Sequence, residues 1–192
     1  MKHIPVFSLL FGALACVIMC FPQVAQDLLY FEYYKLMAKE QLWGLISGHW
    51  VHADNQHLLW NVAALALLGA IIEARSRSML LWSIAIGTVC VDLLLVSPIG
   101  ELNRYCGLSG LLNTLLGVAL YIYWCETRSA IVVVVGILSI VKIAIEIHSG
   151  QSVFTDTTWP PFAEAHLAGI LGTPVALWCY SKSGQGKFKS FT

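Results

Sequence analysis

The sequence predicts an all-α membrane protein, in which six transmembrane helices form one domain over residues 1–192 and a long loop joins the first two helices. Of the 192 residues, 58% are hydrophobic and only 11% are charged, whereas soluble domains carry about a quarter charged residues. Six apolar stretches approach the length of about 20 residues that a bilayer-spanning helix needs. Aromatic residues gather in the long segment between the first two stretches, as they do at membrane interfaces.

Polar or turn-forming residues separate the six apolar stretches. The stretches cover about residues 4–22, 56–72, 79–97, 107–124, 129–147 and 162–180. The segment 23–55 is instead amphipathic, and its aromatic residues are Tyr30, Phe31, Tyr33, Tyr34, Trp43 and Trp50. Amphipathic rings favour the boundary between water and lipid, so we expect this loop to lie on or in one leaflet.

The distribution of basic residues favours an orientation with both termini in the cytoplasm. The cytoplasmic side would then carry Lys2, Arg75, Arg77, Arg128, Lys182, Lys187 and Lys189, and the outer side Lys35, Lys39 and Arg104. The apolar run of the first stretch is long for a signal peptide, and we therefore expect it to remain as a span.

The overall charge and the cysteines point to no additional chemistry. The net charge is zero, with eleven basic and eleven acidic residues, and nothing indicates nucleic-acid binding. The six cysteines include no CxxC pair, so we interpret them as small apolar side chains. We expect no metal and no cofactor.

Polar side chains inside the apolar stretches are the candidates for function, because each is costly in lipid. Lys142 and Glu146 lie one helical turn apart and can neutralise each other. Asp92 has no evident partner in the sequence. A structural ion pair is the expected role of Lys142 and Glu146, with an ion path as the alternative.

The polar residues near the starts of the second, fourth and sixth stretches converge at one depth. His57, Ser109 and His166 each fall within the first two turns of these stretches. Alternate spans run in the same direction, so all three residues lie a short way below the outer surface. Asn61 lies one turn below His57 on the same helix face. Small residues in the fourth and sixth spans allow close packing: Gly107, Gly110, Gly117, Ala165, Gly169 and Gly172.

This set of side chains can perform acyl transfer. A serine hydroxyl becomes a nucleophile when a neutral histidine accepts its proton, and we assign these roles to Ser109 and His166. His57, Asn61 and the backbone N–H of Ser109 are the donors available for an oxyanion. Apart from Glu164, no carboxylate lies at a matching depth in these three spans. We therefore expect a Ser–His dyad. Water, or an amine that acts as nucleophile, would then release the acyl group from Ser109.

The motifs that carry these residues resemble those of the rhomboid family of intramembrane serine proteases, in order across residues 43–180. They are His52-x4-His57-x3-Asn61, Glu73-Ala-Arg75, Gly107-Leu-Ser-Gly110 and Ala165-His166 with Gly169. The resemblance implies a six-helix rhomboid bundle that acts on transmembrane protein substrates. It also implies Ser109 as nucleophile, His166 as base, and a loop after the first span that inserts into the outer leaflet.

Within this family the chain is most similar to the rhombosortases, around residues 47–52 and 106–110. That subgroup belongs to the bacterial inner membrane, with the active site open to the periplasm. It is associated with removing a hydrophobic C-terminal tail that contains Gly-Gly from exported proteins. These properties are expectations that follow from the resemblance.

The chain departs from the family pattern at two positions. Trp43-Gly44 stands where many rhomboids have Trp-Arg, so the hydrogen bonds of that arginine must be replaced or absent. Asn113 stands where rhomboids often have a tyrosine packed on the catalytic histidine. We hypothesise that Asn113 hydrogen-bonds either the His166 ring or an ordered water.

Three other functions fit parts of the pattern. A catalytically silent rhomboid-like protein that binds and escorts membrane clients typically lacks the Ser or the His, and both are present here. An ion-coupled transporter would use Asp92, Lys142 and Glu146. Such proteins tend to show internal repeats and broken helices, and this sequence shows neither pattern.

A metal site is the third alternative, and it would draw on His49, His52, His57 and His166. The spacing of five residues between His52 and His57 directs them apart on a helix, and the sequence lacks HExxH. We expect His49 and His52 to support the loop and to take no direct part in catalysis.

Overall fold

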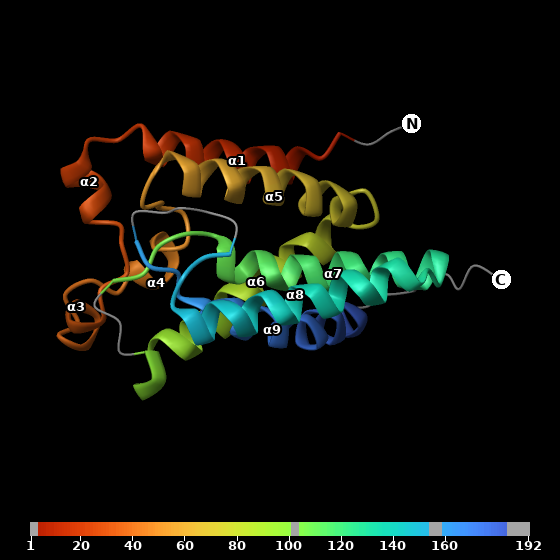
Figure 1. The fold of residues 1–192 in the computed structure, drawn as a ribbon. Coiled ribbons are helices and arrows are strands. Elements are labelled where there is room, and N and C mark those ends of the chain that lie inside the picture. The colour runs from red at the N-terminus through yellow and green to blue at the C-terminus, as the bar shows by residue number, and fades with distance from the viewer. Residues whose placement is uncertain (1–3, 101–103, 154–158, 184–192) are drawn as a thin grey trace.

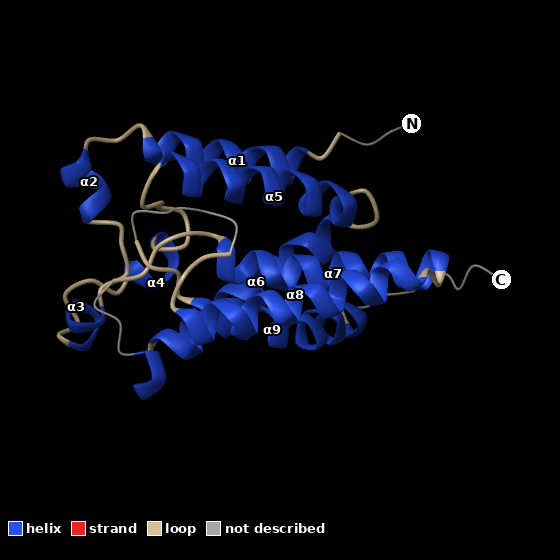
Figure 2. Cartoon of the chain, viewed as in Figure 1, coloured by secondary structure: helices blue, strands red, loops and turns tan. Residues whose placement is uncertain are grey.

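The computed structural model describes residues 4–100, 104–153 and 159–183, and all the regular elements in these ranges are helical (Figures 1 and 2). The shorter elements are α2 (Gln23–Asp27), α3 (Tyr33–Met37), α4 (Gly44–Ser47) and the 3-10 helix η1 (Pro98–Gly100). The longer helices are α1 (Val6–Met19), α5 (Asn55–Glu73), α6 (Arg77–Leu95), α7 (Ser109–Thr127), α8 (Ala130–Ser149) and α9 (Ala163–Lys182).

The longer helices coincide with the six apolar stretches predicted from the sequence. Within the described residues, α5, α6 and α8 are long and apolar enough to cross a membrane, and α1 is a shorter apolar helix. This composition makes the chain a helical membrane protein. Crossing of the bilayer by all six helices, including α7 and α9, stays a prediction. Lys2, Lys187 and Lys189, which the orientation argument counted, lie outside the described residues.

Short polar side chains define where the long helices begin. The Asp54 carboxylate accepts a hydrogen bond from the His57 N–H at 2.7 Å and caps α5. Ser76 caps α6 and Ser129 caps α8 in the same way. Such caps satisfy N–H groups that have no partner inside the helix. Because α5 begins at Asn55, the Asp54 cap places His57 in the first turn of the helix.

Helix α7 is the centre of the bundle, and it packs against α5, α6, α8 and α9. Many of its apolar side chains are buried, among them Leu111, Leu115 and Val118. Helix α1 packs against α5, which places it at the periphery (Figure 1). Polar side chains of α7 that face the bundle are therefore surrounded by the other helices.

The ends of the bundle differ in structure. At one end, Glu73 of α5 accepts hydrogen bonds from the Phe7 and Ser8 N–H groups at 3.0 and 2.9 Å, and thereby caps α1. Arg75 pairs with Glu126 of α7 at 2.7 Å at the same end. At the other end, α5, α7 and α9 begin beside the segment that contains α2, α3 and α4 (Figure 1). The segment expected to be a loop, 23–55, thus contains three short helices joined by turns and irregular backbone.

Candidate active site

Ser109 is the first residue of α7, and the glycine two residues earlier determines how the chain enters that helix. Gly107 has a φ of +102°, a backbone conformation that side chains other than glycine rarely adopt. A Cβ at this position would lie 2.5 Å from the His57 ring. Gly107 therefore lets the chain turn into α7 while the His57 ring stays next to the serine.

The contact between α7 and α9 brings Ser109 toward His166. A Cβ on Gly169 would lie only 1.9 Å from the Gly110 carbonyl oxygen, so the two backbones touch at this crossing. Ser109 adjoins Gly110 in sequence, and His166 lies about one helical turn before Gly169. The close crossing predicted from these glycines is present, and Ser109 and His166 line the same cavity beside it.

His57 and Asn61 both reach the same site from α5. The His57 Nδ1 accepts a long hydrogen bond of 3.5 Å from the Ala53 N–H, which favours a proton on Nε2. Asn61 is buried, and within the described residues its Nδ2 has no hydrogen-bond partner. An unpaired buried donor is uncommon in a folded protein. Donors held ready in this way suit an oxyanion that forms only during the reaction.

These four predicted residues line one cavity of about 410 Å³. The remaining wall comes from Trp60 and from the segments before α7 and α9, and consists of Arg104, Tyr105, Cys106, Ser152, Trp159, Pro160, Pro161 and Phe162. In the part of the chain that the structure describes, the Ser109 hydroxyl makes no hydrogen bond with the His166 ring. Catalytic hydrogen bonds are often long without substrate, so proton transfer between them stays a prediction.

A second cavity, of about 510 Å³, lies beside Ser109 and forms a groove between α5 and α8. Its lining is mostly apolar and consists of Trp60, Asn61, Ala64, Leu68, Ser109, Leu112, Asn113, Leu116, Ser139 and Lys142. Ser109 and Asn61 line both cavities. An apolar segment lying in the groove would therefore reach the serine.

The sequence-based expectation of a dyad overlooked a carboxylate. Glu146 Oε2, near the end of α8, lies 3.1 Å from His166 Nδ1. Glu146 belongs to the fifth apolar stretch and not to the three parallel ones that carry His57, Ser109 and His166. The fifth stretch runs the opposite way, so its last turn reaches the depth at which the second, fourth and sixth begin. Counting depth over all six stretches would have placed Glu146 level with His166, although not which way its side chain faces.

Glu146 and Lys142 do form the ion pair predicted from their spacing, with Lys142 Nζ 2.7 Å from Glu146 Oε1. In the described residues the Asn113 amide makes no hydrogen bond with the His166 ring, and a bond to an ordered water stays a prediction. The Asn113 Nδ2 donates to the Ser109 carbonyl at 2.8 Å, on its own helix. The partner of the His166 ring in the described residues is Glu146.

Asp92, which had no evident sequence partner, pairs with His49. The His49 Nε2 and Asp92 Oδ1 lie 3.0 Å apart, and the His49 ring packs edge-on against Tyr105 at 5.4 Å between centroids. The Tyr105 hydroxyl in turn donates to the Gly107 carbonyl at 3.1 Å. His49 thus supports the segment that leads into Ser109, as the sequence suggested.

His52 is buried behind His57, with their ring centroids 5.1 Å apart. Burial, followed by the proximity of His57, lowers the pKa of His52 from its ordinary 6.5 to about 3. The ring is therefore neutral at physiological pH. Among the described residues, no group of three or more His, Cys, Asp or Glu side chains is arranged to hold a metal ion.

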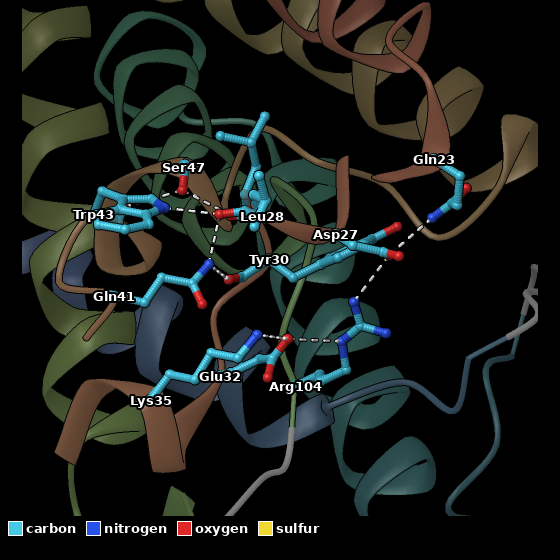
Figure 3. A network of polar contacts seen from close by, with 11 residues as sticks. Gln23, Asp27, Leu28, Tyr30, Glu32, Lys35, Gln41, Trp43, Ser47 and Arg104 are labelled. Carbon is cyan, nitrogen blue, oxygen red and sulfur yellow. Dashed lines mark hydrogen bonds and ion pairs between the residues drawn. The ribbon is translucent and has the colours of Figure 1, made fainter. Parts of the chain in front are cut away.

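Side chains of the segment 23–55 hydrogen-bond to backbone carbonyls of the same segment around Trp43-Gly44 (Figure 3). The Trp43 ring N–H donates to the Leu28 carbonyl at 2.7 Å, where the Gln41 amide also binds. The Ser47 hydroxyl donates to the Leu29 carbonyl at 2.7 Å. A Cβ on Gly44 would lie 3.2 Å from the Phe31 backbone. The loop thus makes these bonds without an arginine after Trp43.

Arg104 ties this loop to the segment before α7. It lies 3.2 Å from Asp27 and 3.6 Å from Glu32 (Figure 3). Phe31 and Tyr105 also exchange two backbone hydrogen bonds, of 3.1 and 2.9 Å. The loop and the wall of the cavity therefore form one connected structure.

The fold and the site together define a class, a helical membrane protein that gathers a serine, two histidines and an asparagine at one end of its bundle. Comparison with protein families matches residues 39–183 to the Rhomboid domain. The chain therefore belongs to the rhomboid family, whose members are generally intramembrane serine proteases. A search of curated proteins found no match to the chain.

Proposed function

We propose that this protein is an intramembrane serine endopeptidase in which Ser109 is the nucleophile and His166 the general base. The observation that carries the proposal is the convergence of Ser109, His166, His57 and Asn61 on one cavity, at the start of three helices. The match of the chain to the rhomboid family supports the same chemistry.

In the proposed reaction, His166 takes the proton of Ser109 while the hydroxyl oxygen attacks a substrate carbonyl. His57, Asn61 and the Ser109 N–H donate to the resulting oxyanion. His166 then gives its proton to the leaving amine, and the acyl-enzyme is resolved by water or by another amine. The cavity that these residues line gives water room to approach the serine.

The proposed substrates are exported proteins held in the membrane by a C-terminal tail, as in the rhombosortases that the chain resembles. The apolar groove between α5 and α8 supports a helical, hydrophobic substrate segment, because Ser109 lies on its border. The proposed location is the bacterial inner membrane, with both termini in the cytoplasm and the site open to the periplasm. No observation favours the catalytically silent alternative, since both Ser109 and His166 line the cavity.

The test compares wild type with Ser109→Ala, each reconstituted in vesicles with a substrate that carries a Gly-Gly-containing hydrophobic C-terminal tail. We expect wild type to release the tail and Ser109→Ala to fall by at least about 10³-fold, since the nucleophile is lost. Mass spectrometry of the product identifies the bond cleaved, and an added amine mass would indicate transpeptidation. Equal cleavage by the two proteins would refute the proposal.

A further inference from the structure

Glu146 is a fully buried carboxylate that receives polar contacts from three directions. Its side chain is 0% exposed. The Oε1 atom lies 2.7 Å from Lys142 Nζ and accepts a hydrogen bond from the Val153 N–H at 3.1 Å. The Oε2 atom is left for the catalytic histidine, at 3.1 Å from His166 Nδ1. One side chain thus connects α8, the start of the following loop and α9.

These contacts fix the ionisation state of the carboxylate. A buried charge in a membrane protein persists only when it is paired and hydrogen-bonded. Lys142 supplies the cation, and Val153 supplies a further hydrogen bond. An ionised carboxylate only accepts hydrogen bonds, so the proton between Glu146 and His166 belongs to Nδ1 of the ring. The lone pair of His166 is then on Nε2.

We propose that Glu146 is a positioning residue that extends the catalytic pair to a Ser109–His166–Glu146 triad, with Lys142 holding the carboxylate in place. The inference rests on the proposed function. When Ser109 attacks, its proton passes to Nε2 of His166, and the ring becomes an imidazolium with Nδ1–H still bonded to Glu146. Nε2 later returns that proton to the leaving amine. Glu146 stabilises the imidazolium and stays unprotonated throughout.

A purely structural role would leave part of this geometry without a purpose. To tie the loop to α8, Glu146 needs only Oε1, which already receives Lys142 and Val153. Oε2 adds a bond to the one ring that must present a basic nitrogen to Ser109. Asn113, the residue expected to support that ring, instead bonds to its own helix. Glu146 therefore fills the orienting role left open by the missing tyrosine.

The first experiment measures kcat, KM and the pH profile for wild type, Glu146→Gln and Glu146→Asp on a tail-bearing substrate. We expect Glu146→Gln to lower kcat by about 10² to 10⁴-fold with KM within about two-fold, because the tautomer and the imidazolium lose their support. Glu146→Asp should recover part of the rate. The rate at which a fluorophosphonate labels Ser109 should fall together with kcat in Glu146→Gln. This reaction needs an activated serine but no bound peptide substrate.

The pH profile separates this role from simple loss of structure. The titratable or charged groups around the His166 ring include Glu146, its partner Lys142 on the same helix α8, and the His57 ring from α5. Removing the negative charge makes protonation of His166 harder, so the acidic limb of kcat/KM should move to lower pH. Lys142→Met/Glu146→Gln should show the same shift and is a second variant that buries no unpaired cation. Glu126→Gln, the same substitution in the ion pair at the opposite end, should keep wild-type kinetics.

Two outcomes would overturn the triad. One is a folded Glu146→Gln enzyme with wild-type kcat and an unmoved acidic limb. The other is imidazole nitrogen NMR of the wild type that finds the His166 proton on Nε2, assigned by comparison with His166→Gln. The NMR result needs no substrate and decides the inference either way. If wild type cleaves no better than Ser109→Ala, the proposed function itself fails, whereas an active wild type matched by Glu146→Gln removes only the triad.

Discussion

At the scale of single residues, the surroundings of Ser109 combine a buried, unpaired amide with a closely packed histidine ring. Asn61 is buried with its Nδ2 unpaired within the described residues, and His57 stands against Gly107 with no room for a Cβ between them. Leaving a buried amide unpaired costs about 1–3 kcal/mol. This cost is consistent with a site arranged for a charge that develops during the reaction.

Asn61→Ala should therefore lower kcat by about 10²-fold or more and leave KM nearly unchanged, because the lost hydrogen bond forms in the transition state. Steady-state cleavage assays on reconstituted protein check this. Asn55→Ala, the same substitution at the exposed start of α5, is the matched control and should behave as wild type. A wild-type kcat for Asn61→Ala would remove Asn61 from the oxyanion site.

At the scale of helices, the approach of α7 to α9 determines whether the site exists. The backbones touch at Gly110 and Gly169, and the Thr114 hydroxyl adds a hydrogen bond to the Gly169 carbonyl. Close contact between small residues is a principal source of helix association in membranes. Ser109 adjoins Gly110 and His166 lies about one turn before Gly169, so we expect stability and the proposed catalysis to depend on this one contact.

Gly169→Ala should push α7 and α9 apart, because its Cβ would overlap the Gly110 carbonyl. We expect the free energy of unfolding to fall by about 1–3 kcal/mol and kcat to fall at least about ten-fold, since small misplacements are costly in catalysis. Thermal unfolding in detergent and cleavage assays measure both effects.

Gly136→Ala is the control for this substitution, because a Cβ there meets its nearest atom at 3.9 Å, an ordinary contact. It should leave stability and rate close to wild type. If the two alanine variants behaved alike, the close crossing would not be what holds the catalytic residues together.

At the scale of the whole molecule, the two ends of the bundle have separate tasks. The end where α5, α7 and α9 begin carries the cavity and the loop network around Arg104. The opposite end carries the cap that Glu73 places on α1 and the pair between Arg75 and Glu126. Substitutions at this second end should therefore change stability more than chemistry.

Glu73→Gln should lower the free energy of unfolding by about 1.5–3 kcal/mol, because a buried carboxylate loses its charge-assisted hydrogen bonds to the start of α1. Its kcat should stay within about two-fold of wild type, since the site lies at the other end. Glu126→Gln alters a more exposed ion pair and should cost less than about 1 kcal/mol. A large loss of kcat in folded Glu73→Gln would show that the two ends are coupled.

Much of the fold and of the site was predictable because the sequence of each apolar stretch by itself determines whether that stretch forms a membrane helix. Apolar length indicates which stretches become helices, and alternation of direction gives their relative depth. These two rules grouped Ser109, His166, His57 and Asn61, which the structure places around one cavity. The absence of an arginine after Trp43 was visible in the sequence, but the hydrogen bonds that Gln41, Trp43 and Ser47 make within the loop were not.

The sequence by itself determined the helical stretches, the shared depth of the polar residues and the small residues that let two helices meet. Only the tertiary structure decided that Glu146 faces His166, that Asp92 pairs with His49, and that Asn113 turns back to its own helix. Apolarity and depth depend on each stretch alone. A side-chain partner depends on which helices become neighbours and how each is rotated about its axis, and packing of the whole bundle sets both.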